Sequence, residues 1–285
     1  MGVVNVTPDS FSDGGMYFAP EAAVEHALRL LDEGADLLDL GAESTRPGSK
    51  AGGDAPTVSA EEEQARLLPV VEGVLKARPD AIISVDTYKA ATALAAVNTG
   101  AEIVNDVSGF VWDAKMADVC AETGAGVVLM HTRGTPDRWS EQEQLTPSAV
   151  LETVRAGLAG SLALASSAGI AAESVVLDPG YGFGKRFEEN YTLLARQSEL
   201  LALGRPLLVG LSRKSFLMRR VARLPGEAAS DVPKQAREHS GLAAMTAAIL
   251  QGASIVRVHA VRAAVDAAQV ADAFLHAAGA SAEDL

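Results

Sequence analysis

The stretch Pro206-Leu207-Leu208-Val209-Gly210-Leu211-Ser212-Arg213-Lys214-Ser215 joins an apolar run directly to two cations flanked by hydroxyl groups. The apolar part, residues 206–211, indicates a buried strand of a parallel sheet, because β-favouring residues occupy both of its faces. Arg213 and Lys214 follow at the point where this strand is expected to end, and parallel α/β proteins bind ligands at that end of their strands. Alone, the stretch fits an exposed loop equally well, so its meaning depends on how the other strands end.

The same order of strand, loop and helix recurs about eight times along the chain. Strands are expected at residues 2–6, 36–41, 81–85, 102–105, 126–130, 174–177, 206–211 and 253–258. Helices are expected at residues 20–33, from Ser59 onward, and at 89–98, 114–122, 147–167, 188–203 and 262–276. Short apolar strands that alternate with helices indicate a parallel sheet with right-handed crossovers. Eight units in 285 residues predict one (β/α)8 TIM barrel, a single domain over residues 1–285.

Composition narrows the classes of function. A formal net charge of -13 argues against general binding to nucleic acid or to an anionic membrane. An anionic substrate would therefore need a local cluster of Arg and Lys. The single cysteine, Cys120, excludes an intrachain disulfide. No apolar run is long enough to span a bilayer and no signal sequence is evident, so the sequence predicts a cytoplasmic protein.

Charged or amide side chains stand at every expected strand end. Turn and helix-capping roles explain some single cases, such as Asp86 and Asp106, but not the whole set. Asp39 lies inside an expected strand, so we expect it to be buried and hydrogen-bonded. The set comprises Asn5, Asp39 with Glu43-Ser44-Thr45-Arg46, Asp86, Asn105 with Asp106, His131, Asp178, Arg213 with Lys214, and Arg257 with His259.

These residues divide by their chemistry into three groups. The first offers paired donors and acceptors suited to a flat heterocycle, the second is cationic and suited to phosphate, and the third offers oxygen ligands for Mg²⁺. Together they indicate a reaction in which diphosphate departs. The groups are Asp86, Asn105, Asp178 and Lys214; then Arg46, Arg257 and His259 with Thr45; then Asn5 and Asp13.

Two long motifs carry a resemblance to a known family. Asn5-Val6-Thr7-Pro8-Asp9-Ser10-Phe11-Ser12-Asp13-Gly14-Gly15 resembles the first signature of dihydropteroate synthases, and Glu43-Ser44-Thr45-Arg46-Pro47-Gly48 resembles their second loop. Shorter motifs follow in the family's order, so that the resemblance spans essentially the whole chain. They are Ser84-Val85-Asp86-Thr87, Asn105-Asp106-Val107, Asp178 to Lys185, Ser212-Arg213-Lys214-Ser215 and Arg257-Val258-His259.

The resemblance implies a pterin-binding barrel of the folate pathway that forms a homodimer. It implies condensation of 6-hydroxymethyl-dihydropterin diphosphate with 4-aminobenzoate to give 7,8-dihydropteroate and diphosphate. Lys214, Asp86, Arg257 and His259 would be catalytic. The pterin would contact Asp86, Asn105, Met130, Asp178, Phe183 and Lys214; the diphosphate would contact Asn5, Thr45, Arg46, Arg257 and His259. Aminobenzoate would contact Phe11, Pro47, Lys214 and Ser215, and Mg²⁺ would bind Asn5 and Asp13.

Two alternatives remain open. A corrinoid-dependent methyltransferase that binds methyltetrahydrofolate would share the pterin residues but would not need Thr45, Arg46 or the Ser212–Ser215 motif. A non-catalytic pterin-binding paralogue would lose phosphate or aminobenzoate residues. Ala260 points in that second direction, because the family usually has Asp after this histidine, and the change would remove a partner of His259 or Arg257.

Overall fold

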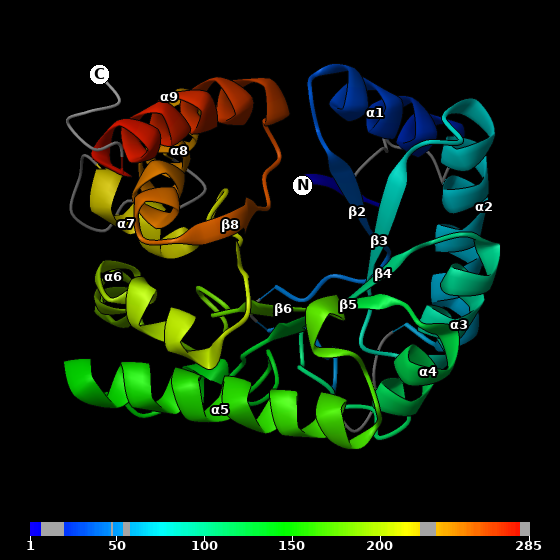
Figure 1. The fold of residues 1–285 in the computed structure, drawn as a ribbon, viewed down its shortest axis with the longest axis horizontal. Coiled ribbons are helices and arrows are strands. Elements are labelled where there is room, and N and C mark those ends of the chain that lie inside the picture. Colours follow the sequence, from blue (N-terminus) through cyan, green and yellow to red (C-terminus); the bar gives the residue numbers. More distant parts are fainter. Residues whose placement is uncertain (7–19, 47, 54–57, 223–231, 280–285) are drawn as a thin grey trace.

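The fold is a closed ring of strands surrounded by helices (Figure 1). The structure is a computed structural model that describes residues 1–6, 20–46, 48–53, 58–222 and 232–279. Eight parallel strands are hydrogen-bonded in sequence order. They are β1 (Gly2–Asn5), β2 (Leu37–Gly41), β3 (Ile82–Asp86), β4 (Ile103–Asp106), β5 (Gly126–Met130), β6 (Val175–Asp178), β7 (Leu207–Val209) and β8 (Ala253–Val256). A parallel bridge between Gly2 and Val258 joins the two edges, so the predicted (β/α)8 barrel is confirmed.

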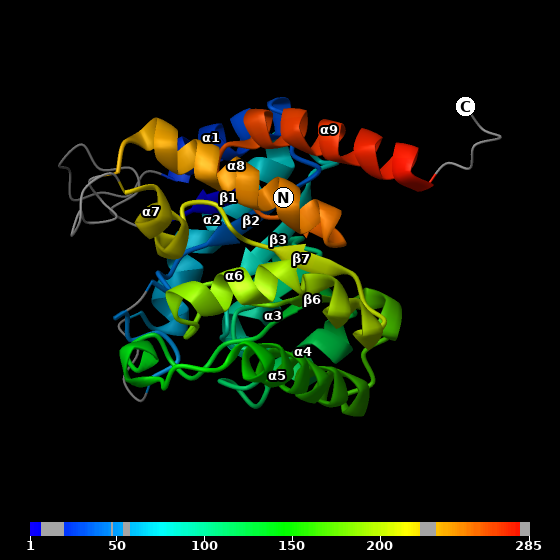
Figure 2. The same ribbon diagram turned by 90° about the vertical axis from the view of Figure 1, so that its left-hand side faces the viewer.

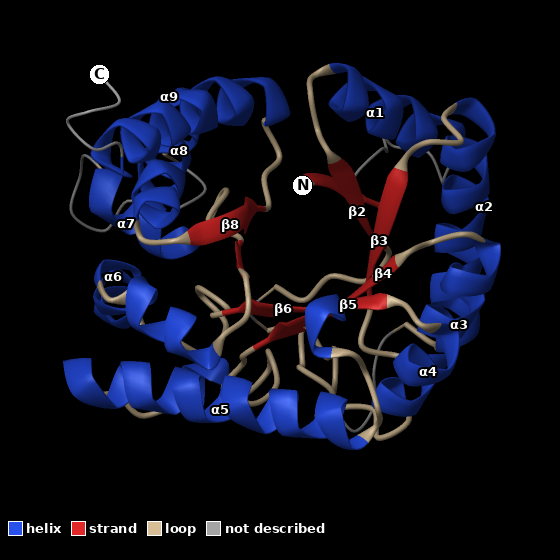
Figure 3. Cartoon of the chain, in the orientation of Figure 1, coloured by secondary structure: helices blue, strands red, loops and turns tan. Residues whose placement is uncertain are grey.

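Helices follow the strands and cover the outside of the ring (Figures 2 and 3). No helix in the described part of the chain is long and apolar enough to cross a membrane. Ser59 caps the helix that it was expected to open, by accepting a hydrogen bond from the Glu62 N–H. The helices are α1 (Pro20–Asp32), α2 (Ala60–Ala77), α3 (Ala90–Thr99), α4 (Met116–Thr123), α5 (Pro147–Ser167), α6 (Phe187–Ala195), α7 (Ser215–Val221), α8 (Lys234–Leu250) and α9 (Val261–Gly279).

The structure departs from the expected helices in two places. The helix expected at 188–203 is divided into α6 and a 3₁₀ segment, Gln197–Leu203. Gln197 is fully buried there, where it accepts a hydrogen bond from the Tyr181 hydroxyl (2.9 Å) and donates one to the Ala248 carbonyl (3.0 Å). These tertiary contacts compete with a regular helix. The second departure is α7 and α8, two helices between β7 and β8 that the sequence analysis did not predict.

The barrel interior is apolar at one end and polar at the other. Met1, Val128 and Leu208 form a buried apolar cluster against Leu37 and Ile103, with Val176 and Ile255 also in contact. Two residues further along these strands, on the same face, the side chains become polar. Leu37 is followed by Asp39, Ile103 by Asn105, Val176 by Asp178 and Ile255 by Arg257. The apolar cluster therefore supports a polar layer at the carboxyl ends of the strands. One domain over residues 1–285 stays a prediction.

Candidate active site

A buried carboxylate, Asp39, links four strands inside the barrel. Its oxygens accept hydrogen bonds from Ser84 Oγ (2.7 Å), Asn105 Nδ2 (3.1 Å) and Arg257 Nε (2.5 Å). Arg257 also donates from its second guanidinium nitrogen to Asp86 Oδ2 at 2.7 Å. Burial raises the pKa of Asp86, and the Arg257 guanidinium opposes that rise. Asp39 therefore holds both an amide and a guanidinium in place, as its position inside an apolar strand predicted.

Asp178 and Lys214 lie on the other side of the same opening. Asp178 ends β6, and its Oδ1 accepts a hydrogen bond from the Gly180 N–H at 2.7 Å. Lys214 Nζ stands 4.1 Å from the centre of the Phe183 ring. Burial lowers the pKa of Lys214 to about 8, and the negative charge of Asp178 opposes the change. Met130 ends β5 in a buried cluster that Phe183 packs against. The predicted pterin residues therefore converge from β3, β4, β5, β6 and the segment after β7.

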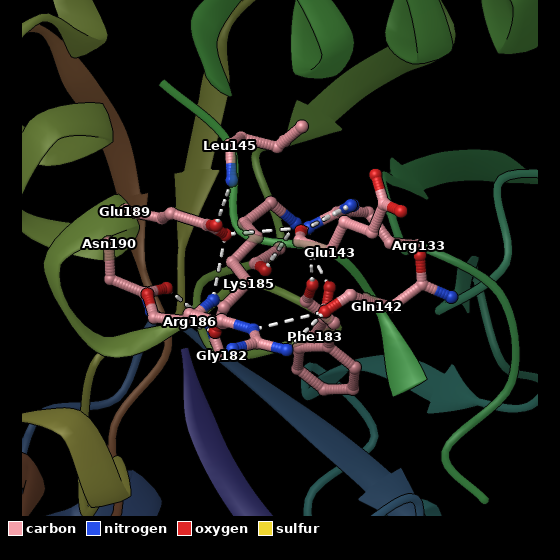
Figure 4. A network of polar contacts seen from close by, with 12 residues as sticks. Arg133, Gln142, Glu143, Leu145, Gly182, Phe183, Lys185, Arg186, Glu189 and Asn190 are labelled. Atoms are coloured by element: carbon pink, nitrogen blue, oxygen red, sulfur yellow. Dashed lines mark hydrogen bonds and ion pairs between the residues drawn. The ribbon is translucent and has the colours of Figure 1, made fainter. Parts of the chain in front are cut away.

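Buried Lys185 fixes the loop that presents Phe183 (Figure 4). Its ammonium group donates to the carbonyl oxygens of Gly180 (2.7 Å), His131 (3.1 Å) and Phe183 (3.3 Å). Asn190 supports the same loop, because its side-chain amide bonds the backbone of residues 182, 185 and 186. Burial lowers the pKa of Lys185 to about 7. No role was predicted for Lys185 or Asn190, although the loop's glycines were a signal: a Cβ at Gly180 would lie 2.0 Å from the His131 oxygen.

An ion pair closes the network from the neighbouring loop. Arg133 donates to the Gly184 carbonyl at 3.2 Å and pairs with Glu189 at 3.5 Å (Figure 4). Glu189 accepts hydrogen bonds from the backbone N–H groups of Arg186 (2.8 Å) and Leu145 (2.7 Å). The loops after β5 and β6 are thereby joined around Phe183. Sequence reasoning also missed this pair, because nothing in the spacing of Arg133 and Glu189 shows that they meet.

The cationic side of the site lies at the ends of β7 and β8 and in the loop after β2. His259 Nδ1 lies 3.0 Å from Ser212 Oγ. Burial lowers the pKa of His259 to about 3. The positive charges of nearby cations lower it further; they belong to Arg213, Arg257, Lys214 and Arg46. These cations therefore lie around one histidine. Arg213 is exposed and holds a left-handed backbone conformation (φ 60°). Asn5 is half-buried at the end of β1, Thr45 is half-buried in the loop after β2, and Ser215 begins α7.

Three predicted residues lie outside the described part of the chain: Phe11, Asp13 and Pro47. They belong to the expected aminobenzoate and magnesium contacts. Among the residues that the structure describes, only Lys214 and Ser215 remain for the expected aminobenzoate contact. Only Asn5 remains for the expected magnesium contact.

Comparison with known proteins assigns the chain to a family. Residues 1–259 match the family of pterin binding enzymes. The dihydropteroate synthase of Mycobacterium leprae is 43% identical over 279 residues, covering 97% of this chain and 93% of that protein. The dihydropteroate synthase of Escherichia coli strain K12 is 41% identical, covering 97% of this chain and 92% of that protein. This chain belongs to the dihydropteroate synthase family. The family resemblance and the transferase class expected from the motifs are confirmed.

Solved structures agree with the family assignment. A Xanthomonas albilineans dihydropteroate synthase with 4-aminobenzoic acid has a TM-score of 0.83 at 38% identity, covering 98% of this chain and 93% of that chain. The same enzyme in complex with 7,8-dihydropteroate has a TM-score of 0.80 at 36% identity, with coverages of 98% and 93%. The dihydropteroate synthase interpretation is therefore confirmed.

Three residues with open roles now have structural explanations in this dihydropteroate synthase family member. The His131 ring is buried against Gly157 of α5, where an added Cβ would lie 2.4 Å from its Cδ2 atom, so the ring faces the helix. Asp106 accepts hydrogen bonds from the N–H groups of Ser108 and Phe110, both at 2.8 Å, which is a turn role. Ala260 leaves neither His259 nor Arg257 without a partner, because Ser212 and the two aspartates already fill those places.

Proposed function

We propose that this member of the dihydropteroate synthase family binds the pterin of its substrate between Asp86, Asn105, Asp178 and Lys214. The observation that carries the proposal is the convergence of these side chains on the inside of the barrel, with Asn105 only 4% and Asp178 only 6% exposed. Carboxylates accept from the N–H groups of a heterocycle, and Lys214 donates to a carbonyl oxygen. Met130 and Phe183 provide the apolar faces of the ring's pocket.

The diphosphate of 6-hydroxymethyl-dihydropterin diphosphate would lie beside Asn5, Thr45, Arg46, Arg257 and His259. The cations around His259 support this placement, because they give the strongly anionic chain a local positive site. His259 is neutral at working pH, so it would contribute an N–H donor rather than a charge. Arg257 is already bound to two carboxylates and would join the pterin side to the phosphate side.

The reaction follows from this arrangement. The bond between the exocyclic methylene carbon and the diphosphate oxygen breaks, and the cationic side stabilises the leaving anion. The carboxylates of Asp86 and Asp178 stabilise the positive charge that develops on the pterin methylene. The neutral amine of 4-aminobenzoate, held by Lys214, Ser215, Phe11 and Pro47, then forms the carbon–nitrogen bond and loses a proton to solvent.

The described residues do not form a metal site by themselves. None of their His, Cys, Asp and Glu side chains gather in groups of three or more that could hold an ion. Asn5 offers one amide oxygen, and Mg²⁺ with so few protein ligands depends on waters and substrate phosphates. Magnesium binding by Asn5 and Asp13 therefore stays a prediction, as do the homodimer and the cytoplasmic location.

Diphosphate release tests the proposal. The purified protein is mixed with the pterin diphosphate and Mg²⁺, with and without 4-aminobenzoate, and both products are quantified. We expect release that depends on the amine, with one dihydropteroate formed for each diphosphate. Pterin binding without release would contradict the proposed reaction and favour a non-catalytic role.

A further inference from the structure

The loop between β2 and α2 carries Thr45 and Arg46, and buried side chains outside the reaction fasten it to the barrel. We call its described residues, 42–46 and 48–53, the second loop. Arg66 of α2 donates to the Ala42 carbonyl at 3.1 Å, and the Lys89 ammonium group pairs with the Glu43 carboxylate. The attachment therefore lies two residues before Thr45.

Lys89 serves two carboxylates at once. Besides Glu43, it pairs with Glu63 Oε2 of α2 at 3.2 Å. Thr87 and Thr92 also donate to that oxygen, at 3.1 and 2.7 Å. The side chains of Glu43 and Glu63 are only 5% and 1% exposed. One buried cation with two buried carboxylates leaves an excess negative charge.

The excess charge shows that stability alone does not explain Glu43. Lys89 and Glu63 already form a balanced pair supported by two hydroxyl groups, whereas a further buried carboxylate adds a desolvation cost. Burial raises the pKa of Glu63, and the negative charge of Glu43 adds to that rise. Glu43 instead links the second loop to Lys89 and, through Lys89, to Glu63 of α2.

The far end of the second loop packs against Tyr88, which lies next to Lys89 in the segment after β3. Ala51 is fully buried in a cluster with Tyr88 and Met130. Gly52 lies against Trp112, where an added Cβ would come within 2.2 Å of the indole ring. The Tyr88 ring centre is 4.5 Å from Lys89 Nζ. Tyr88 and Lys89, which are neighbours in the sequence, therefore hold the two ends of the second loop. Tyr88 also packs in one cluster with Met130 of the proposed pterin pocket.

We infer that Glu43, held by Lys89, is a positioning residue that fixes Thr45 and Arg46 for the diphosphate. Arg46 is three residues from Glu43, and its charge reaches His259 across the opening. Glu43 itself would repel an anion, and its pairing with Lys89 offsets part of that repulsion. This inference rests on the proposed function, since it assumes that the diphosphate binds at Thr45 and Arg46.

The test compares two ligands, 6-hydroxymethyl-dihydropterin diphosphate and the alcohol without diphosphate, by calorimetry with Mg²⁺ and without 4-aminobenzoate. In Glu43→Met the Lys89–Glu63 pair remains. We expect the affinity advantage of the diphosphate compound to fall about tenfold, or about 1.4 kcal/mol. The Kd of the alcohol should stay unchanged and the Tm should not fall, because the pterin residues and the balanced pair are untouched and a buried charge is removed.

Two further variants separate positioning from bulk stability. Glu43→Gln keeps an oxygen acceptor for Lys89, so it should restore most of the lost advantage. Lys50→Met removes an exposed cation from the same loop and should change the ratio by less than about twofold, because its charge is screened by solvent.

The outcomes distinguish the inference from the function on which it rests. If the wild-type protein binds both ligands equally, the proposed diphosphate site is wrong and the inference is overturned with it. If the wild type prefers the diphosphate and Glu43→Met keeps that preference, only the inference is overturned. A variant that weakens both ligands equally, or that lowers Tm without restoration by Glu43→Gln, would show that Glu43 serves the fold instead.

Discussion

The two halves of the site hold their charges differently. On the pterin side, Asp39 and Asp86 bind Arg257, which borders both sides, within the barrel. On the diphosphate side, Arg46 and Arg213 are exposed, and no carboxylate of the described residues forms an ion pair with either. The difference teaches that one half is organised by the fold before any ligand arrives, whereas the other keeps its cations available for an anion. Substitutions should therefore separate stability from affinity.

The largest expected effect comes from breaking the paired half. Arg257→Met leaves the buried carboxylate of Asp39 and the half-buried carboxylate of Asp86 without their cation. Removing one member of a buried pair leaves an uncompensated charge, so the free energy of unfolding should fall by about 3 kcal/mol. Turnover should also be lost, because Asp86 would no longer be held. Urea denaturation measures the first effect and diphosphate release the second.

Arg213→Met is the matched control for this comparison. Arg213 is also a site arginine, but it is exposed, so its removal should change the free energy of unfolding by less than about 0.5 kcal/mol. If the two substitutions lower the free energy of unfolding equally, the two halves of the site do not differ in how the fold holds their arginines.

Lys214→Met should reduce turnover while leaving the fold intact. The substitution removes the donor whose ammonium group stands over the Phe183 ring. Loss of one well-placed electrostatic group costs about 10²–10³ in rate. Because burial lowers the pKa of Lys214 to about 8, its charge is held at a cost, and the variant should be at least as stable at pH 7. Steady-state kinetics and thermal unfolding would measure the two effects.

The fold followed from the sequence because its pattern is local. Apolar runs such as 126–130 have the strand's length and composition, and β5 spans those same residues. α7 and α8 were missed because the segment after Ser215 does not follow the regular order of strand, loop and helix from which the other helices were predicted. Gln197 interrupts an expected helix through contacts with Tyr181 and Ala248, which lie far away in the sequence.

The contacts between the predicted site residues could not be read from the sequence. Strand ends identify Asp86 and Arg257, yet nothing in the sequence shows that they meet at 2.7 Å. Arg257 was grouped with the phosphate residues by its charge, and no feature of the sequence indicated that it also donates to two carboxylates. Lys185 and Lys89 were missed because both serve backbone or buried carboxylates behind the site, where a motif gives no indication of partners.

A smaller effect is expected from the half with available cations. Arg46→Met should weaken binding of the pterin diphosphate at least about tenfold, since a phosphate contact by arginine contributes a charge-assisted hydrogen bond of about 1.5–3 kcal/mol. Binding of the pterin alcohol and the Tm should not change. Calorimetry with both ligands measures this, with Lys76→Met as a remote exposed control cation. A parallel loss for the alcohol would place Arg46 on the pterin side.

An effect that depends on pH concerns His259, which sharpens the comparison because it is half-buried among cations. Its folded-state pKa is lowered to about 3, against an ordinary value of 6.5. Between these values the unfolded chain binds the extra proton, so stability falls as the pH drops from 6.5 toward 3 and is unaffected above 6.5. His259→Gln should therefore lose less stability than the wild type between pH 7 and pH 4. Urea denaturation at both values measures the difference, and an NMR titration in which His259 gains a proton near pH 6.5 would contradict it.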